Sequence, residues 1–217
     1  MYKTVVFDLD GTLLNTLTDL ADAGNRLCRK YGWPTHERQA YRYFVGNGIP
    51  KLVERLAPAD QRTPAVLEAA LADFKRDYGQ HLRDTTAPYP GIPEMLAKLK
   101  ANGVQLAVFS NKADALAKEV VKDYFGTQYF TIVRGQMTGV APKPAAEGTN
   151  ALLQALHADP ASTLYVGDSN VDVETAHNAN LPCCGAVWGF RTREELNAAR
   201  AEYLAENSDE LYDVIMK

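Results

Sequence analysis

The chain has 217 residues, of which 46% are hydrophobic and 23% are charged, so it is long enough to bury a substantial core. Its net charge of -4, with Lys and Arg scattered along the chain, argues against nucleic-acid binding. It shows no apolar run of bilayer-spanning length and no signal peptide, so we expect a cytoplasmic protein without a membrane partner. The cysteines Cys28, Cys183 and Cys184 have neither disulfide nor zinc spacing, which predicts reduced core thiols.

Short apolar or β-branched segments alternate with helical patterns along the chain. The expected strands are residues 4–7, 105–109, 131–133, 163–166 and 184–187. This alternation predicts an α/β fold with a parallel sheet wrapped by helices. One helix has Pro93 in its first turn and Gly103 after its end, and another begins at Thr192, which is placed to form a capping box with Glu195.

The stretch between the first two expected strands is too long for a simple crossover. Apolar residues recur in it at helical spacing, and they are Leu17, Leu20, Ala23, Leu27, Leu67, Ala70, Leu71, Phe74 and Tyr78. The pattern predicts a small helical domain, residues 15–87, inserted into a core domain of residues 1–14 and 88–217. Residues 85–91 are rich in turn formers and are the expected linker.

Two carboxylates one residue apart, Asp8 and Asp10, follow the first expected strand and precede Gly11. Ligands of open parallel sheets bind at the carboxyl ends of strands. Two carboxylates placed there repel each other unless a cation joins them, and Mg²⁺ prefers such oxygen ligands. The alternative is an Asp-rich turn whose side chains cap backbone amides.

A second acidic cluster follows the fourth expected strand and opens a helix. Asp168 would supply the further carboxylate that an Mg²⁺ site needs, and Asp172 lies one helical turn on, where it is placed to orient the ligands. Ser169 lies between them. Taken alone, the same residues also suit a helix N-cap with an acidic first turn.

Polar residues also follow the second expected strand. Ser110 and Asn111 lie where a strand end enters a helix, an arrangement that favours phosphate binding, although Ser110 also suits an ordinary N-cap. Lys143 lies between two prolines that fix its backbone, and we expect its side chain to stay flexible. It is either a solvated surface charge or the cation that neutralises a phosphate and its nucleophile.

Together these segments resemble, over the whole chain, the four motifs of the haloacid dehalogenase superfamily of phosphatases. The matching residues are Asp8, Asp10, Gly11, Thr12, Ser110, Lys143, Asp168, Ser169 and Asp172. The resemblance implies a Rossmann-like core, a helical cap inserted after the first motif, Mg²⁺ as cofactor, and a small phosphomonoester as substrate. It implies that Asp8 is nucleophile and metal ligand, that Asp10 is general acid/base with its main-chain carbonyl on the metal, and that Asp168 is a metal ligand. The residues expected to bind the phosphate are Gly11, Thr12, Ser110, Asn111 and Lys143.

Segments 44–50 and 186–190 look like those of phosphoglycolate phosphatase and its close relatives. The resemblance makes phosphoglycolate the leading substrate and places Gly46, Asn47 and Gly48 at the substrate. Two positions depart from the pattern: Asn15 stands where many relatives have an aspartate, and Ala146 interrupts the proline-rich segment after Lys143. Both departures leave the expected chemistry intact.

Other functions use a similar set of residues. A response-regulator receiver domain also holds phosphate with acidic residues, Mg²⁺, a hydroxyl and a lysine, but it has no use for the large insert or for an acid at Asp10. A dehalogenase works without Mg²⁺ and typically lacks the second aspartate. A sugar-phosphate mutase keeps every motif and differs chiefly in its cap, so it remains the main enzymatic alternative.

Two roles are open for the charged residues near the turn at residues 46–48. Arg42, Lys51 and Arg55 are candidates to meet an anionic leaving group, or they are solvated surface charges. The four histidines lack a nucleophile or a metal-spaced partner, so we expect surface or packing roles for them. They are His36, His81, His157 and His177.

Overall fold

The computed structural model describes residues 1–217, which form two compact units. One comprises Met1–Leu14 and Pro88–Lys217 and contains the main sheet, and the other, Asn15–Ala87, is helical. The predicted α/β fold with a helical insertion after the first strand is confirmed. None of the helices combines the length and the apolar character needed to cross a membrane.

Six parallel strands form the sheet of the first unit in the order β5-β4-β1-β6-β7-β8. They are β1 (Thr4–Phe7), β4 (Gln105–Ala113), β5 (Phe130–Gln136), β6 (Thr163–Gly167), β7 (Cys183–Ala186) and β8 (Tyr203–Ala205). The short strands β2 (Leu14–Asn15) and β3 (Ala87–Pro88) pair separately. The chain adds β4 and β5 on one side of β1 and the later strands on the other. The strand order therefore reverses at β1, where open α/β sheets bind ligands.

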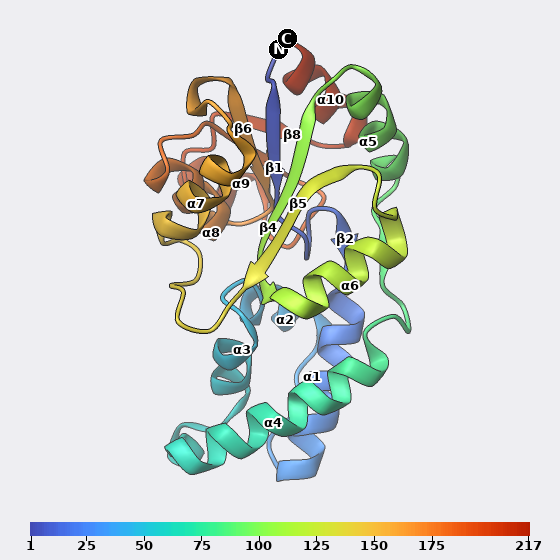
Figure 1. Ribbon diagram of the computed structural model, residues 1–217. Helices are drawn as coiled ribbons and strands as arrows, with labels where there is room; N and C mark the ends of the chain where they lie inside the picture. Colours follow the sequence, from blue (N-terminus) through green and yellow to red (C-terminus); the bar gives the residue numbers. More distant parts are fainter. The chain divides into compact units, whose positions relative to one another are not determined.

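Helices cover both faces of this sheet, with α7, α8 and α9 on one face and α5, α6 and α10 on the other (Figure 1). They are α5 (Ile92–Ala101), α6 (Asp114–Phe125), α7 (Ala146–Leu156), α8 (Asn170–Asn178), α9 (Arg193–Ala198) and α10 (Ser208–Met216), with a 3-10 turn at Pro160–Ser162. Because both faces are covered, β1 is fully buried and its sequence is apolar without alternation. The two termini lie together, and the amide of Tyr2 donates to the carbonyl of Ile215 (2.9 Å).

The local signals at the helix ends hold in the structure. Thr192 accepts a hydrogen bond from the amide of Glu195 (3.3 Å), and Glu195 accepts one from the amide of Thr192 (2.9 Å), so the predicted capping box at α9 is confirmed. Pro93 lies in the first turn of α5. The three cysteines are free and buried, as predicted. Three short strands were not predicted: β2 and β3 have two residues each and β8 has three, too few to show an alternating pattern.

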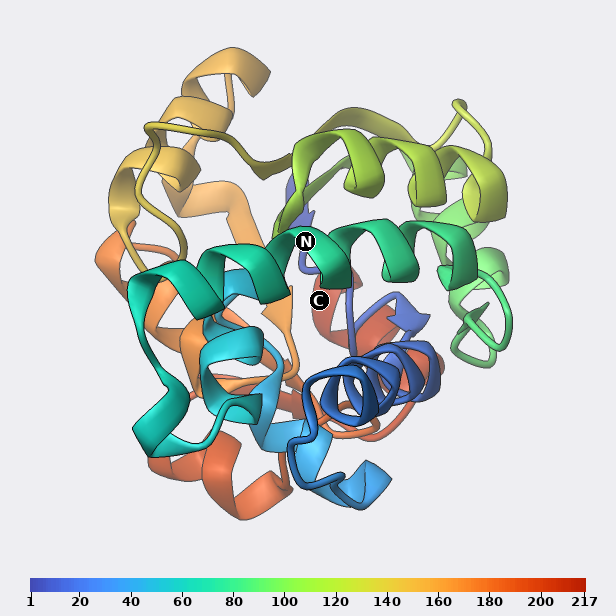
Figure 2. The same ribbon diagram turned by 90° about the horizontal axis from the view of Figure 1, so that it is seen from below.

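The insert contains α1 (Leu17–Tyr31), α2 (Arg38–Phe44), α3 (Ile49–Leu56), a 3-10 turn at Ala59–Gln61 and α4 (Pro64–His81). Both predicted helical patterns are confirmed, in α1 and in α4, which lie side by side (Figures 1 and 2). The buried apolar residues of the insert include Leu20, Leu27, Leu52, Phe74 and Tyr78. The carboxylate of Asp19 in α1 accepts hydrogen bonds from the amides and hydroxyls of Thr85 and Thr86, which ties the start of the insert to its end.

Candidate active site

The polar residues predicted from the sequence meet at the carboxyl ends of β1, β4 and β6. Asp8 follows β1 directly, and its amide still donates to the carbonyl of Val166 in β6 (2.8 Å). Asp168 follows β6 in the same way. Both carboxyl groups are buried, with Asp8 8% and Asp168 1% exposed. Parallel pairing therefore brings together residues that are 160 positions apart in the chain.

Three buried carboxylates form a cluster here, because oxygen atoms of Asp8, Asp168 and Asp172 all lie within 4.8 Å of one another. Burial, reinforced by the charge of Asp172 and opposed by Lys143, raises the pKa of Asp8 to about 6. Burial and the charges of Asp172 and Asp8 raise the pKa of Asp168 well above its usual range. The cluster thus concentrates negative charge in a place that water does not screen.

Lys143 is the cation of this cluster. Its Nζ lies 2.8 Å from Oδ1 of Asp8 and 2.7 Å from Oδ1 of Asp172, and its side chain is 2% exposed. Burial by itself lowers the pKa of Lys143, but the charges of Asp172 and Asp8 outweigh burial and raise this pKa well above its usual range. The expectation of a flexible side chain is wrong, since two ion pairs in a buried site hold it.

Asp172 has both carboxylate oxygens engaged. Oδ1 contacts Lys143, while Oδ2 accepts from the amide (3.1 Å) and the hydroxyl (2.7 Å) of Ser169. The same residues therefore cap the start of α8 and fix the ammonium of Lys143. The helix-capping reading and the site reading, which the sequence left open as alternatives, describe one arrangement.

Asp168 is held from two sides. Its Oδ1 accepts from the hydroxyl of Thr12 (3.0 Å), and its Oδ2 accepts from the amide of Phe190 (2.7 Å). Next to Phe190, the indole nitrogen of Trp188 donates to the carbonyl of Thr12 (3.0 Å). The segment 188–190 therefore supports the carboxylate, a role that its sequence did not reveal because no charged or hydroxyl side chain marks it.

Two glycines make this packing possible. Gly11 has a φ of +93°, and a Cβ on it would lie 2.3 Å from Oδ2 of Asp168. A Cβ on Gly189 would lie 2.2 Å from Cβ of Asp168. Both distances are shorter than any tolerated contact, so each position requires glycine to let the backbone approach the carboxylate.

The end of β4 differs from the expectation. The strand runs on to Ala113, which is the N-cap residue of α6, so Ser110 is not an N-cap and that alternative is wrong. Asn111 grips the backbone of Lys143: its Oδ1 accepts from the Lys143 amide (2.8 Å), and its Nδ2 donates to the Lys143 carbonyl (3.2 Å). The side chain of Asn111 therefore supports the segment that carries Lys143, and the predicted role of Asn111 in substrate binding stays a prediction.

Lys112 was missed as a site residue. Its Nζ lies 3.1 Å from Oδ1 and 3.4 Å from Oδ2 of Asp10, and its side chain is 2% exposed. Residues two apart in a strand share a face, so Lys112 follows from Ser110 once β4 is extended. The expected strand ended at residue 109, three residues before Lys112, so the sequence analysis did not place Lys112 on the same face as Ser110.

The remaining predicted substrate residues lie in the insert. Gly46, Asn47 and Gly48 form the loop between α2 and α3, and both glycines have positive φ. Arg55 supports this loop by donating to the carbonyl of Phe44 and to Oδ1 of Asn47, each at 2.8 Å. Lys51, a second of the three cations considered, pairs with Glu54 (2.8 Å). A role of this loop in substrate binding stays a prediction.

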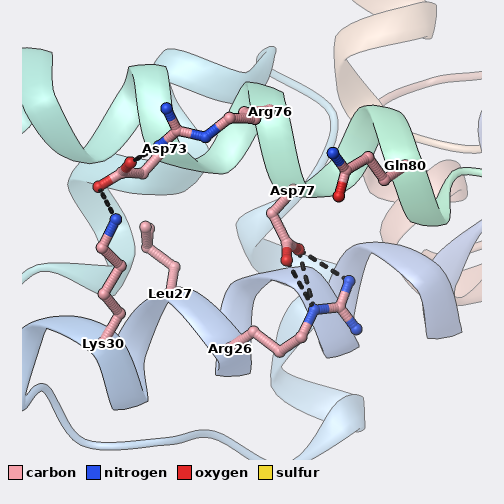
Figure 3. A pocket seen from close by; sticks show the side chains of 7 residues that line it. All are labelled: Arg26, Leu27, Lys30, Asp73, Arg76, Asp77 and Gln80. Carbon is pink, nitrogen blue, oxygen red and sulfur yellow. Dashed lines mark hydrogen bonds and ion pairs between the residues drawn. The ribbon is translucent and has the colours of Figure 1, made fainter.

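A pocket in the insert contains none of the predicted site residues (Figure 3). It is lined by Arg26, Leu27, Lys30, Asp73, Arg76, Asp77 and Gln80. Its charges are already paired across α1 and α4, with Arg26 2.8 Å from Asp77 and Lys30 2.6 Å from Asp73. The charged residues that line the pocket therefore form partly exposed ion pairs that join α1 and α4.

The acidic cluster fits a divalent cation. Oδ1 of Asp8 is buried and accepts no hydrogen bond, although Lys143 lies near it. Carboxylate oxygens are the ligands that Mg²⁺ prefers. Since Asp172 is committed to Lys143 and Ser169, Asp8 and Asp168 are the side chains suited to hold the ion.

Comparison with known proteins places this arrangement in a family. Residues 5–186 match the model of the haloacid dehalogenase-like hydrolases. The chain belongs to the haloacid dehalogenase-like hydrolase family. A phosphoglycolate phosphatase from Neisseria meningitidis is 31% identical over 97% of this chain and 92% of its own, and one from Thiobacillus denitrificans is 31% identical over 87% and 84%. A crystal structure from Lactobacillus delbrueckii subsp. bulgaricus has a TM-score of 0.93 and 28% identity, covering 99% of this chain and 98% of its own.

These matches bear on the sequence predictions at the level of the family. The resemblance to haloacid dehalogenase superfamily phosphatases is confirmed, and the chain is a phosphatase of that family by reaction class. The two units reproduce the α/β sheet and helical insertion that this resemblance implied.

Proposed function

We propose that the protein is a Mg²⁺-dependent phosphatase that hydrolyses a small phosphomonoester through an aspartyl-phosphate intermediate on Asp8, with phosphoglycolate as the leading substrate. The observation that carries the proposal is the buried Asp8 carboxylate, which lies 2.8 Å from the Lys143 ammonium and shares a cluster with Asp168. A carboxylate with a raised pKa beside a fixed cation suits nucleophilic attack on a phosphorus atom.

In the first half-reaction, an Asp8 oxygen attacks phosphorus in line with the leaving oxygen. A bond from Asp8 to phosphorus forms while the bond from phosphorus to the leaving oxygen breaks, and Asp10 gives that oxygen a proton. Lys143 neutralises charge on Asp8 and on the phosphoryl group, and Ser110 donates to a phosphoryl oxygen. Gly11, Thr12 and Asn111 would contribute amides to the same phosphoryl group.

In the second half-reaction, Asp10 takes a proton from water as the water oxygen bonds to phosphorus. The bond between phosphorus and Asp8 breaks, which releases inorganic phosphate and restores the Asp8 carboxylate. Mg²⁺ bound by Asp8, Asp168 and the main-chain carbonyl of Asp10 would supply charge neutralisation throughout. The protein side chains thus move the protons, and one residue serves both steps.

Substrate choice rests on the named relatives and on the resemblance of segments 44–50 and 186–190. The test is a panel of phosphate esters that includes phosphoglycolate, nucleotides and sugar phosphates, compared by kcat/KM with Mg²⁺ and with a chelator. We expect phosphoglycolate to rank high and chelation to abolish turnover. Phosphoglycolate in last place would overturn the substrate. Isomerisation of a sugar phosphate faster than its hydrolysis would show a mutase.

A further inference from the structure

The two aspartates of the first motif each face a different buried lysine. Lys143 contacts Asp8, while Lys112 contacts both oxygens of Asp10 and does not share that carboxylate with Lys143. Lys112 and Lys143 are each 2% exposed in their side chains. Burying an ammonium costs free energy unless a partner compensates, so each lysine needs its carboxylate. The site therefore separates the charges that serve the nucleophile from those that serve the proton carrier.

We propose that Lys112 is a positioning residue for Asp10, the group assigned above to proton transfer, so this inference rests on the proposed function. Asp10 is partly exposed, at 15% of its side chain, and only Lys112 among the contacts described fixes its carboxylate. A proton donor works only when its oxygen is held within hydrogen-bond reach of the leaving oxygen. The ion pair restricts the rotation of Asp10 about its side-chain bonds and so limits the positions that its oxygen atoms can take.

The backbone gives Lys112 the stiffness that this role needs. Lys112 lies in β4 rather than in a loop, and its amide donates to the hydroxyl of Ser110 (3.2 Å). Groups built on strands are held more accurately than groups on loops. Because β4 pairs in parallel with β1 up to Phe7 and Val108, the residues that follow these two positions, Asp10 and Lys112 among them, lie at the same end of the sheet.

The test exploits the different needs of two leaving groups. Phosphoglycolate expels a strongly basic alkoxide that requires a proton, while p-nitrophenyl phosphate expels a stable phenolate that does not. General acid catalysis contributes about 100- to 10,000-fold, so misplacing the acid in Lys112→Met is expected to slow single-turnover phosphorylation by phosphoglycolate about 10- to 100-fold. The rate with p-nitrophenyl phosphate should change less than about threefold on the same reasoning. Lys112→Arg should recover part of the loss.

Lys118→Met is the matched control, since Lys118 is an exposed lysine of α6 that pairs with Asp114 (2.7 Å). It should leave both rates unchanged. The second measurement is a double-mutant cycle: in an Asp10→Asn background, Lys112→Met should cause no further loss with phosphoglycolate. Circular dichroism melting checks that each variant is folded. If Lys112→Met does not fold, the two substrates are compared with Lys112→Arg instead.

Equal losses with both substrates and a raised KM would overturn the proposal and make Lys112 a phosphate-binding group. Additive losses in the double-mutant cycle would overturn it as well. The proposed function has its own separate criterion, since wild-type protein must release phosphate from either ester and Asp8→Asn must not. If wild-type protein fails that criterion, the proposed function falls and the assignment of Lys112 falls with it.

Discussion

Burial raises the pKa of Asp8 from its ordinary value of 3.8 to about 6. In the metal-free protein the ionised carboxylate is therefore less stable than it would be in water. Between those two pH values the folded protein binds a proton that the unfolded chain has lost. The stability that the group contributes is present below about pH 4 and disappears as the pH rises through about 6. A shift of this size corresponds to roughly 3 kcal/mol. Asp8, the proposed nucleophile, therefore lowers the stability of the metal-free fold at neutral pH.

Asp8→Asn tests whether the ionised carboxylate of Asp8 destabilises the metal-free fold. The amide neither ionises nor attacks phosphorus, so we expect no detectable turnover together with a metal-free fold that is more stable at pH 7 by up to roughly 3 kcal/mol. Urea denaturation of both proteins from pH 4 to pH 7 measures the effect. The free energy of unfolding of Asp8→Asn should exceed that of wild type by an amount that grows as the pH rises. A variant that is less stable than wild type at pH 7 would contradict the direction of the pKa shift.

Mg²⁺ should offset the free-energy cost of burying the carboxylates of Asp8 and Asp168. A cation between Asp8 and Asp168 binds only the folded state and stabilises it by about 2.7 kcal/mol at 100 times its Kd. We therefore expect Mg²⁺ to raise the melting temperature of the wild type, and expect Asp168→Asn to lose most of this increase. Glu174→Gln is the control, because Glu174 is an exposed acid on the neighbouring helix α8. An equal response in Asp168→Asn would exclude Asp168 as a ligand.

At the scale of elements, the side chain of Asp19 joins the two ends of the insert. Asp19 is 2% exposed, and its two oxygens accept from the amides of Thr85 and Thr86 (2.9 Å each) and from their hydroxyls. A buried carboxylate with four donors is stable only while all of them stay in place. The first turn of α1 and the residues after α4 are thus joined although 66 positions separate them.

Asp19→Asn should weaken this junction, because an amide nitrogen cannot accept the two hydrogen bonds made by one carboxylate oxygen. We expect the insert to lose about 3 kcal/mol of stability, within the range for breaking one partner of a buried charged network. Trp33 is buried in the insert, so its fluorescence in a Trp188→Phe background follows insert unfolding in urea. Asp22→Asn, an exposed change on the same helix, should have little effect. Equal midpoints for both variants would show that the junction contributes nothing.

The elements also show what the sequence predicts and where it stops. The strands before Asp8 and Asp168 are recognisable because buried parallel strands are continuously apolar, and their carboxyl ends must meet. The contact of Lys112 with Asp10 joins positions 102 apart and depends on where β4 ends, a boundary that apolar patterning does not mark. The support from Phe190 is a backbone amide, which leaves no trace in the side-chain sequence.

At the scale of the whole molecule, the acidic cluster and the hydrogen bonds of Asp19 lie in different units. All side chains suited to the metal lie in Met1–Leu14 and Pro88–Lys217, and Asp19 with its partners lies in Asn15–Ala87. Each unit has its own buried apolar residues. A ligand stabilises only those openings that release it, so the effect of Mg²⁺ should depend on whether the units unfold together.

We predict that they open separately, and amide hydrogen exchange followed by mass spectrometry tests this. At 100 times its Kd, Mg²⁺ should slow exchange about 100-fold in peptides of β1, β6 and α8, wherever exchange requires opening of the sheet unit. Peptides of α1 and α4 should exchange at the same rate with and without Mg²⁺. Asp19→Asn should show the opposite pattern, with faster exchange in α1 and α4 and unchanged exchange in β1 and β6. Equal protection of the insert by Mg²⁺ would mean that the two units unfold as one cooperative body.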